Sequence, residues 1–373
     1  MRGLYVHIPF CARKCAYCDF YSLTVPPETR QSYIEAVLRE AEDCKGMPFQ
    51  TVYLGGGTPS LLGGALLKKL MTGLGAIFDL SGVKEMTIEV NPESATSEFL
   101  DGAADAGFTR ISIGVQSLND NELQAAGRIH TASQAIDTVT LAKGKGFRSI
   151  SADVIIGLPG QTWLSLHQTL ERLVFSGIEH LSLYCLMLEE GTPLAENPPR
   201  TLPSEDMQAE LFQFAGSLLE RYGYRHYEIS NFAREGYESR HNLVYWHGGE
   251  YLGLGPAAAS HLNGKRYRNR ADLAGYMKQP GGKPEDIEEL GPKEKAAEEA
   301  MLRLRLLEEG IDTRQLAEKH GQENVREIFE RCERMAARGE MLYDGLRYRL
   351  SPSRVLTSNP VFAELLGLND TLS

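Results

Sequence analysis

Cysteine is scarce in this sequence of 373 residues, and its distribution is uneven. Six cysteines are present, and three of them, Cys11, Cys15 and Cys18, lie within eight consecutive positions. So few cysteines exclude a small disulfide-framed secreted module, which needs many. A cluster of thiols in a reducing compartment is instead typical of a metal-binding or redox-active loop. We expect the scattered remainder, at positions 44, 185 and 332, to be buried or half-buried side chains.

The chain also lacks a basic excess, a long apolar run and a leader sequence. It carries 39 Lys and Arg against 50 Asp and Glu, a formal net charge of -11 at pH 7, which argues against a general binder of nucleic acid backbones. No apolar run reaches the length that we expect of a membrane span, and no signal peptide precedes the first strand-like segment. We therefore expect a cytoplasmic protein whose contact with a membrane is transient.

Strand-like and helix-like segments alternate over the first half of the chain. Short apolar segments closed by turn residues predict six strands, at 4–8, 51–54, 86–90, 110–115, 150–156 and 181–184. Apolar residues at helical spacing lie between them. This alternation predicts an α/β fold of parallel strands with crossover helices. Six units are fewer than the eight of a closed barrel, so we predict an incomplete (β/α)6 barrel, open on one side.

Unusual polar residues and glycines fall at the carboxyl ends of these predicted strands. Parallel β/α folds build their sites at that end. Glu89 and Asp153 are carboxylates at such ends, suited to accept hydrogen bonds from hydroxyl or amino groups. The segments and residues expected to converge on one rim are 11–18, 55–58, Glu89, Gln116, Asp153 and 157–160. We expect the glycines at 55–57 to let the backbone approach a ligand closely.

The pattern changes after residue 193. We predict a partial barrel at 1–200, an extension at 201–280 that begins with a helix at 205–222, and a small C-terminal domain at 281–373. Helical patterns at 293–307, 313–319 and 325–338, followed by a hairpin at 341–350, make the last part winged-helix-like. Basic and acidic residues are mixed throughout it, so we predict no nucleic acid partner.

The spacing of the cysteine cluster, Cys-x3-Cys-x2-Cys, selects among metal sites. Zinc sites usually pair Cys-x2-Cys with a second pair elsewhere, and this sequence has no second pair. Iron–sulfur clusters typically take four thiolates from short loops. Three thiolates on a four-iron cluster leave one iron open to a ligand from outside the chain.

The same spacing, with the aromatic residue Tyr17 before the last cysteine, resembles the signature of the radical S-adenosylmethionine superfamily. The resemblance implies that Cys11, Cys15 and Cys18 bind a [4Fe-4S] cluster, whose open iron binds the amino and carboxylate groups of S-adenosylmethionine. In that superfamily an electron from the cluster can cleave the sulfonium to a deoxyadenosyl radical. The incomplete barrel predicted above is the fold that this resemblance implies.

Segments 4–19, 55–59, 113–117 and 153–162 resemble the oxygen-independent coproporphyrinogen III oxidase group. The resemblance covers nearly the whole chain. It implies that the residues around S-adenosylmethionine are Tyr5, Tyr17, Gly56, Gly57, Thr58, Glu89, Gln116, Arg128 and Asp153, with Met187 near the adenosine.

Two kinds of protein make up that group, and position 20 separates them. The oxidases carry a fourth cysteine two residues after the third, where this chain has Phe20. The second kind, the HemW-type haem chaperones, carries a His-Asn-x-x-Tyr-Trp motif, which His241 to Trp246 match. Imidazole is a frequent ligand of haem iron, and neighbouring aromatic rings can cover a porphyrin face. The adjacent His247 is a second candidate ligand.

From these observations we predict a haem chaperone that binds a [4Fe-4S] cluster, S-adenosylmethionine and, near His241, haem. The resemblance implies delivery to membrane haemoproteins of the respiratory chain. We assign no catalytic residue, and the sequence leaves open a homodimer, the second axial ligand and whether S-adenosylmethionine is cleaved. The alternatives are a radical enzyme acting on a porphyrinogen and, less favoured, a nucleic-acid modifier that uses the C-terminal domain.

Overall fold

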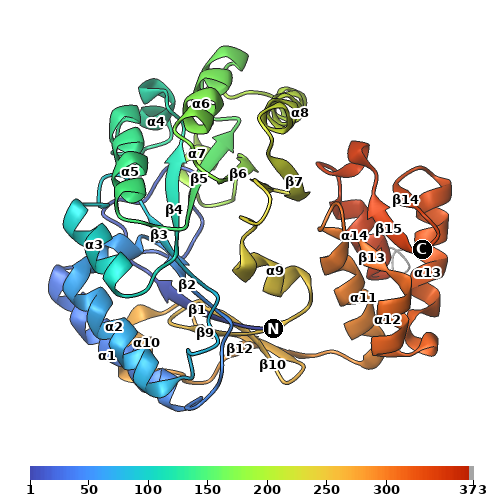
Figure 1. Cartoon of the computed structure of the whole chain (residues 1–373), viewed down its shortest axis with the longest axis horizontal. Helices are drawn as coiled ribbons and strands as arrows, with labels where there is room; N and C mark the ends of the chain where they lie inside the picture. Colours follow the sequence, from blue (N-terminus) through green and yellow to red (C-terminus); the bar gives the residue numbers. More distant parts are fainter. Residues whose placement is uncertain (369–373) are drawn as a thin grey trace.

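The computed structural model describes residues 1–368 and confirms the predicted partial barrel (Figure 1). Six neighbouring strands run parallel in chain order at the centre of one twelve-stranded sheet. They are β1 (Arg2–Ile8), β2 (Thr51–Gly56), β3 (Glu85–Val90), β4 (Arg110–Gln116), β5 (Ser149–Ile156) and β6 (His180–Cys185). Both faces of such strands are covered, which explains why their sequences are nearly continuous apolar runs.

Helices cover the outer face of the barrel. They are α1 (Pro27–Glu42), α2 (Gly63–Ile77), α3 (Ser97–Asp105), α4 (Asp120–Ala125), α5 (Ala132–Gly144) and α6 (Trp163–Phe175), with a short 3-10 helix η1 (Pro59–Leu62) before α2. The stretch Pro59–Ile77 is long and apolar enough to cross a membrane by length and composition, which corrects the expectation that no run reaches that length. In the structure this stretch packs beside α1 and α3, and Leu67, Leu70 and Leu74 lie in the core.

The chain after β6 extends both edges of the sheet. β8 (Asn231–Ala233) pairs with β6 and β7 (Arg225–Glu228), while β9 (Glu250–Leu254) pairs with β1 and leads to β10 (Ala259–Leu262), β11 (Lys265–Arg268) and β12 (Glu285–Glu289). The helices of this part are α7 (Pro193–Glu196), α8 (Glu205–Arg221), α9 (Arg240–Trp246) and α10 (Leu273–Lys278). α9 contacts β1, β2, β3 and β9 and closes the barrel at the amino ends of the strands (Figure 1).

A second hydrophobic core lies in the C-terminal part, drawn in orange and red in Figure 1. Its helices are α11 (Pro292–Leu304), α12 (Thr313–His320), α13 (Gln322–Ala337) and α14 (Asn359–Leu365), with a 3-10 turn η2 (Pro352–Arg354). Three short strands, β13 (Ile311–Asp312), β14 (Met341–Tyr343) and β15 (Arg347–Leu350), form its antiparallel sheet. The helices and the β14–β15 hairpin agree with the predicted winged-helix-like domain.

Candidate cofactor site

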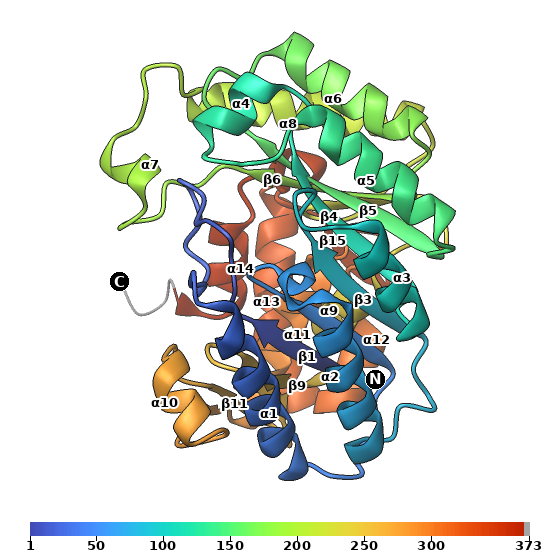
Figure 2. The same cartoon turned by 90° about the vertical axis from the view of Figure 1, so that its left-hand side faces the viewer.

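The three clustered cysteines lie on the loop that follows β1. This loop lies at the end of the strands opposite to the N-terminus (Figure 2). Backbone hydrogen bonds close its base, from Leu23 N to the Pro9 oxygen at 2.8 Å and from Cys11 N to the Leu23 oxygen at 3.0 Å. A third, from Ala16 N to the Ala126 oxygen at 3.1 Å, ties the loop to the end of α4. The loop is therefore held at both its base and its tip.

A cavity of about 410 Å³ opens between this loop and the carboxyl ends of β2 to β6. We call it the rim cavity, and its volume is within the roughly 300–1,000 Å³ of small-molecule sites. Eleven of the fourteen predicted site residues line it: Cys11, Cys15, Tyr17, Cys18, Gly56, Gly57, Glu89, Gln116, Arg128, Asp153 and Met187. The predicted convergence of the strand ends is thus largely confirmed.

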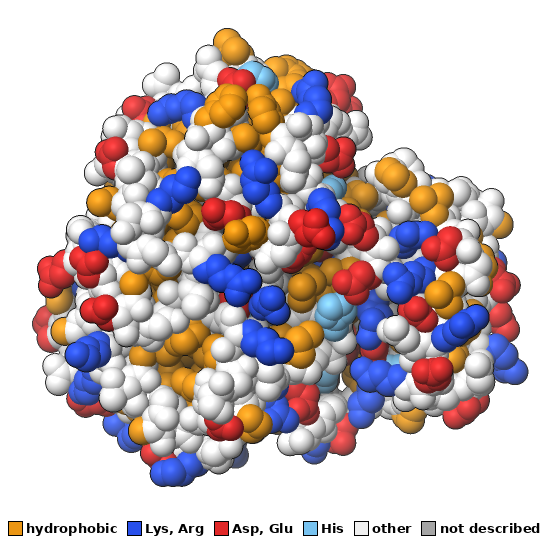
Figure 3. All heavy atoms as spheres, in the orientation of Figure 1, with side chains coloured by type: hydrophobic (Ala, Val, Ile, Leu, Met, Phe, Trp, Pro, Cys, Tyr) orange, Lys and Arg blue, Asp and Glu red, His pale blue; other side chains and the backbone are white. Residues whose placement is uncertain are grey.

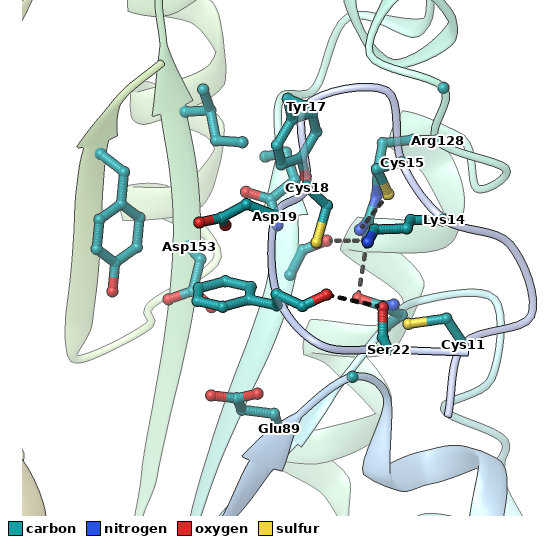
Figure 4. Close-up of a pocket in the computed structure, with 18 of the residues that line it drawn as sticks. Cys11, Lys14, Cys15, Tyr17, Cys18, Asp19, Ser22, Glu89, Arg128 and Asp153 are labelled. Carbon is teal, nitrogen blue, oxygen red and sulfur yellow. Dashed lines mark hydrogen bonds between the residues drawn. The ribbon is translucent and has the colours of Figure 1, made fainter. Parts of the chain in front are cut away.

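The arrangement of the three thiols fits a cluster better than a single ion. Within residues 1–368, no group of three His, Cys, Asp or Glu side chains is placed to hold one metal ion. The three cysteines are instead spread along the cavity wall (Figure 4). Ligands that each bind a different iron of one cluster need such a spread. Burial raises the pKa of the Cys18 thiol to about 11, so binding of a metal there must also displace a proton.

Arg128 joins the cysteine loop to two strand ends. Its guanidinium donates to Cys15 Sγ at 3.5 Å, to Asn91 Oδ1 at 2.8 Å and to the Gly114 oxygen at 2.8 Å. Burial opposes its charge, but Tyr17, Cys15 and neighbouring groups raise the pKa of Arg128 overall. Arg128 therefore places a positive charge beside the thiols, in a cavity that Arg13 and Lys14 also line (Figure 4).

Two carboxyl groups lie on the opposite wall. Glu89 accepts from Tyr53 Oη at 2.6 Å and from Gly56 N at 3.1 Å, and burial, with the charge of Asp153, raises the pKa of Glu89 to about 7. Asp153 accepts from Ser112 Oγ at 3.3 Å, and burial raises its pKa as well. Such groups can accept hydrogen bonds from the hydroxyl or amino groups of a bound ligand.

Gln116 adopts a strained backbone at the end of β4. Its φ is 63°, one of four positive values among the described non-glycine residues. The pairing of β4 with β5 shifts register between Ile113 and Gln116. Bulges and left-handed residues of this kind concentrate at sites where a side chain must be redirected, and here the residue lines the rim cavity.

The structure gives the glycines of 55–57 a different role from the one we predicted. A Cβ on Gly56 would lie 2.4 Å from the His7 ring, and one on Gly57 would lie 2.7 Å from the Phe10 oxygen. The missing side chains therefore leave space for the His7 ring and the Phe10 backbone, so that the chain at the end of β1 can lie close to the end of β2. Gly56 and Gly57 still line the cavity, but close packing of the cysteine loop explains their identity.

Three predicted residues lie outside the rim cavity. Thr58 is buried behind it, with Oγ1 3.6 Å from Cys11 Sγ. Tyr5 points into the barrel, where its hydroxyl lies 3.0 Å from His7 Nδ1. The turn 157–160, expected at the same rim, does not line the cavity either, since it leads directly into α6. Conversely, the prediction omitted Asn91, Ser112 and Tyr184 as site residues, although Asn91 directly follows β3 and Tyr184 lies near the end of β6.

The third predicted residue outside the rim cavity is His241, which the structure places at the opposite end of the barrel. The ring is 1% exposed, with Nδ1 2.8 Å from Thr51 Oγ1 and Nε2 2.7 Å from Tyr245 Oη. It stacks on Tyr53 with ring centroids 5.0 Å apart. In this state the imidazole presents no free nitrogen to a haem, so the prediction that haem binds near it requires α9 to move.

Most of the rest of the motif is half-buried. Trp246 packs against the C-terminal domain, where the Arg305 guanidinium lies 4.4 Å from its ring centroid. Its indole Nε1 is buried and has no hydrogen-bond partner. The adjacent His247 bonds to Glu309 at 2.9 Å. His241 itself is thus closed to a porphyrin as the structure stands, although the outer face of the motif is partly accessible.

Comparisons with known proteins agree with this architecture. The model of the radical SAM superfamily matches residues 5–173. The chain is 38% identical over 305 residues to the heme chaperone HemW of Lactococcus lactis, covering 81% of this chain and 80% of the relative. It is 32% identical to heme chaperone HemW of Bacillus subtilis, covering 98% and 100% of the two chains. The solved structure of coproporphyrinogen III oxidase (HemN) from Escherichia coli shares the fold, with a TM-score of 0.85 at 23% identity, over 98% of this chain and 89% of that one.

Proposed function

Because this chain belongs to the HemW family of the radical SAM superfamily, we propose that it is a haem chaperone that binds haem and delivers it to a haemoprotein. The observation that carries the proposal is the extent of the match, which runs over nearly the whole chain and the whole length of a relative named for that activity. The remaining features of the proposal come from the rim cavity.

We propose that Cys11, Cys15 and Cys18 hold a [4Fe-4S] cluster in the rim cavity, with S-adenosylmethionine beside it. When bound, the cluster supplies low-potential electron transfer and an open iron. The protein's own residues bind and orient the second ligand. Glu89 and Asp153 are half-buried in the cavity wall, where they are placed to accept its amino or hydroxyl hydrogens.

Phe20 supports a carrier rather than an oxidase at this site. It lies where the related oxidases have a fourth cysteine, and its ring is 65% exposed at the cavity wall. The cavity consequently has three thiols from this loop and an apolar side chain in place of the fourth.

The acceptor that we propose is a membrane haemoprotein of the respiratory chain, approached from the cytoplasm by transient contact. We propose no nucleic acid partner, because the net charge of -11 disfavours phosphate backbones. A homodimer is a further proposal, which sedimentation of the reconstituted protein would decide.

The test is anaerobic reconstitution with iron and sulfide, followed by a haem titration monitored by the Soret band. We expect about four irons per chain, as a four-iron cluster requires, and haem binding that saturates near one equivalent. Cys15→Ser should lose iron, whereas Cys332→Ser should keep it because Cys332 is buried in α13, remote from the cavity. Wild-type protein that shows no saturable haem binding would refute the chaperone proposal.

A second candidate is a radical oxidoreductase that acts on a porphyrinogen. The observation in its favour is Glu89, a half-buried carboxyl group whose pKa is raised to about 7, in the same cavity as the thiols. Groups with such pKa values are common at catalytic sites. Deoxyadenosine release that depends on added coproporphyrinogen would favour this enzyme, and its absence under reducing conditions would favour the carrier.

A further inference from the structure

The outer side of α6 and α8 carries large apolar side chains in contact with solvent. Trp163, Leu164 and Phe175 of α6 are 42%, 66% and 72% exposed. Figure 3 shows hydrophobic side chains gathered at this end of the molecule, with charged side chains of both signs beside them. Next to them an open hollow of about 640 Å³ runs along α8, and we call its lining the α8 face: Trp163, Glu210, Gln213, Phe214, Ser217 and Arg221. Exposed apolar surface of this kind is typical of an interaction site.

Four residues of the α8 face form one stripe along the helix. Glu210, Phe214, Ser217 and Arg221 recur at every third or fourth position, the spacing at which side chains share one side of a helix. Phe214 is half-buried and the other three are exposed. Neither Glu210 nor Arg221 makes a side-chain hydrogen bond or an ion pair within residues 1–368. The stripe therefore ends in two opposite charges, and neither has an ion-pair partner in the described part of the chain.

The stripe is symmetric about its own midpoint. Glu210 and Arg221 lie equally far from that midpoint along the helix, and so do Phe214 and Ser217. When α8 packs in antiparallel orientation on α8 of a second copy, each Glu210 therefore meets the Arg221 of the other copy. Each Phe214 meets the small side chain of Ser217. A surface that complements itself in charge and in size is what a two-fold interface between identical chains requires.

The neighbouring helix α6 obeys the same symmetry. Trp163 at its start contacts Phe214 in the middle of α8, and Phe175 at its end contacts Tyr222 just after α8. The two helices consequently run in the same direction. A two-fold axis that makes α8 antiparallel to its copy then makes α6 antiparallel to its copy as well. Trp163 of each copy would lie toward Phe175 of the other, and both exposed rings would leave water.

We propose that the α8 face is the contact surface between two copies of this chain, packed through α8 in antiparallel orientation. This rests on the homodimer proposed above and names its surface. The two opposite charges of the stripe lie about 16 Å apart along the helix axis, which is too far for one small molecule to bridge. A second α8 presents the matching charges at the same separation, because it carries the same residues.

The test is sedimentation equilibrium of the reconstituted wild type and of variants that exchange these charges. Glu210→Arg places like charges opposite each other at both ends of the stripe, because each substitution acts twice across a two-fold axis. It should weaken self-association roughly tenfold or more, and Arg221→Glu should do the same. The double variant with both substitutions should restore association, since opposite charges meet again. The control is Glu318→Arg, the same charge change at an exposed position of α12, which should leave association unchanged.

The outcomes separate the surface from the proposals around it. A wild-type dimer that withstands both single substitutions, or that the double variant does not restore, would overturn the α8 face as the contact and leave the homodimer standing. A wild type that stays monomeric at every concentration would overturn both, and would assign the hollow to a different partner. Neither result decides the chaperone function, because the haem titration described above tests that function without reference to the oligomeric state.

Discussion

Acidification should destabilise the protein through His241, and the structure gives the reason. The ring lies in the closed floor of the barrel between Thr51 and Tyr245, stacked on Tyr53. The Glu85 carboxylate accepts from the His241 backbone nitrogen at 3.0 Å. Burial lowers the pKa of His241 to about 3. The folded protein therefore keeps this imidazole neutral under conditions in which the unfolded chain protonates it.

The sign and size of the effect follow from that difference. The unfolded pKa of histidine is about 6.5, and the folded value is lower. The contribution of His241 to stability is therefore fully present above about pH 7 and is lost progressively as the pH falls from about 6.5 toward 3. At pH 5 the loss amounts to about 2 kcal/mol, and at pH 4 to about 3 kcal/mol.

Urea unfolding of wild type and His241→Gln, each at about pH 7.5 and pH 5, measures this contribution. Other buried histidines are present in both proteins, so their titration cancels in the difference. Wild type should lose about 2 kcal/mol more than the variant between the two pH values. Equal losses in both proteins would mean that solvent reaches His241, and would refute the closed floor of the barrel.

Two further predictions concern the rim cavity. Gly57→Ala places a Cβ against the backbone at Phe10, so it should lower the free energy of unfolding by about 1–3 kcal/mol and reduce the iron content. The control is Gly75→Ala, in open space on α2, which should raise the free energy of unfolding by about 0.5–1 kcal/mol. Arg128→Lys keeps a charge but loses the forked contact with Asn91 and the Gly114 oxygen, so S-adenosylmethionine affinity, measured by calorimetry, should fall by roughly 10–100-fold. Unchanged unfolding and iron content in the first case, or unchanged affinity in the second, would contradict these assignments.

The sequence was sufficient to predict where the rim cavity lies. The strands β1 to β5 each end at or near a residue that sequence patterning also marked, because hydrophobic periodicity stops where the chain leaves the barrel. Glu89, Asp153 and the three cysteines could be placed together from that rule alone, since parallel strands align their carboxyl ends. The same rule, applied more strictly, would have included Asn91 and Tyr184.

Sequence patterns could not predict the contacts that depend on strand register and on backbone geometry. The positive φ of Gln116 accompanies a register shift in the pairing of β4 with β5. No residue type in the sequence predicts that shift. Gly57 was expected to face a ligand, but a Cβ there would meet the Phe10 backbone. Both depend on how closely two strands approach, a property of the assembled sheet rather than of either segment.

His241 shows that a chain can match a sequence motif while the motif's histidine is used for contacts within the fold. His241 belongs to a six-residue pattern, yet its two nitrogens are used to hold α9 against β2, at the amino ends of the strands. A haem bound at this motif would therefore need α9 to leave β2, because both ring nitrogens of His241 are already bonded while the barrel floor is closed.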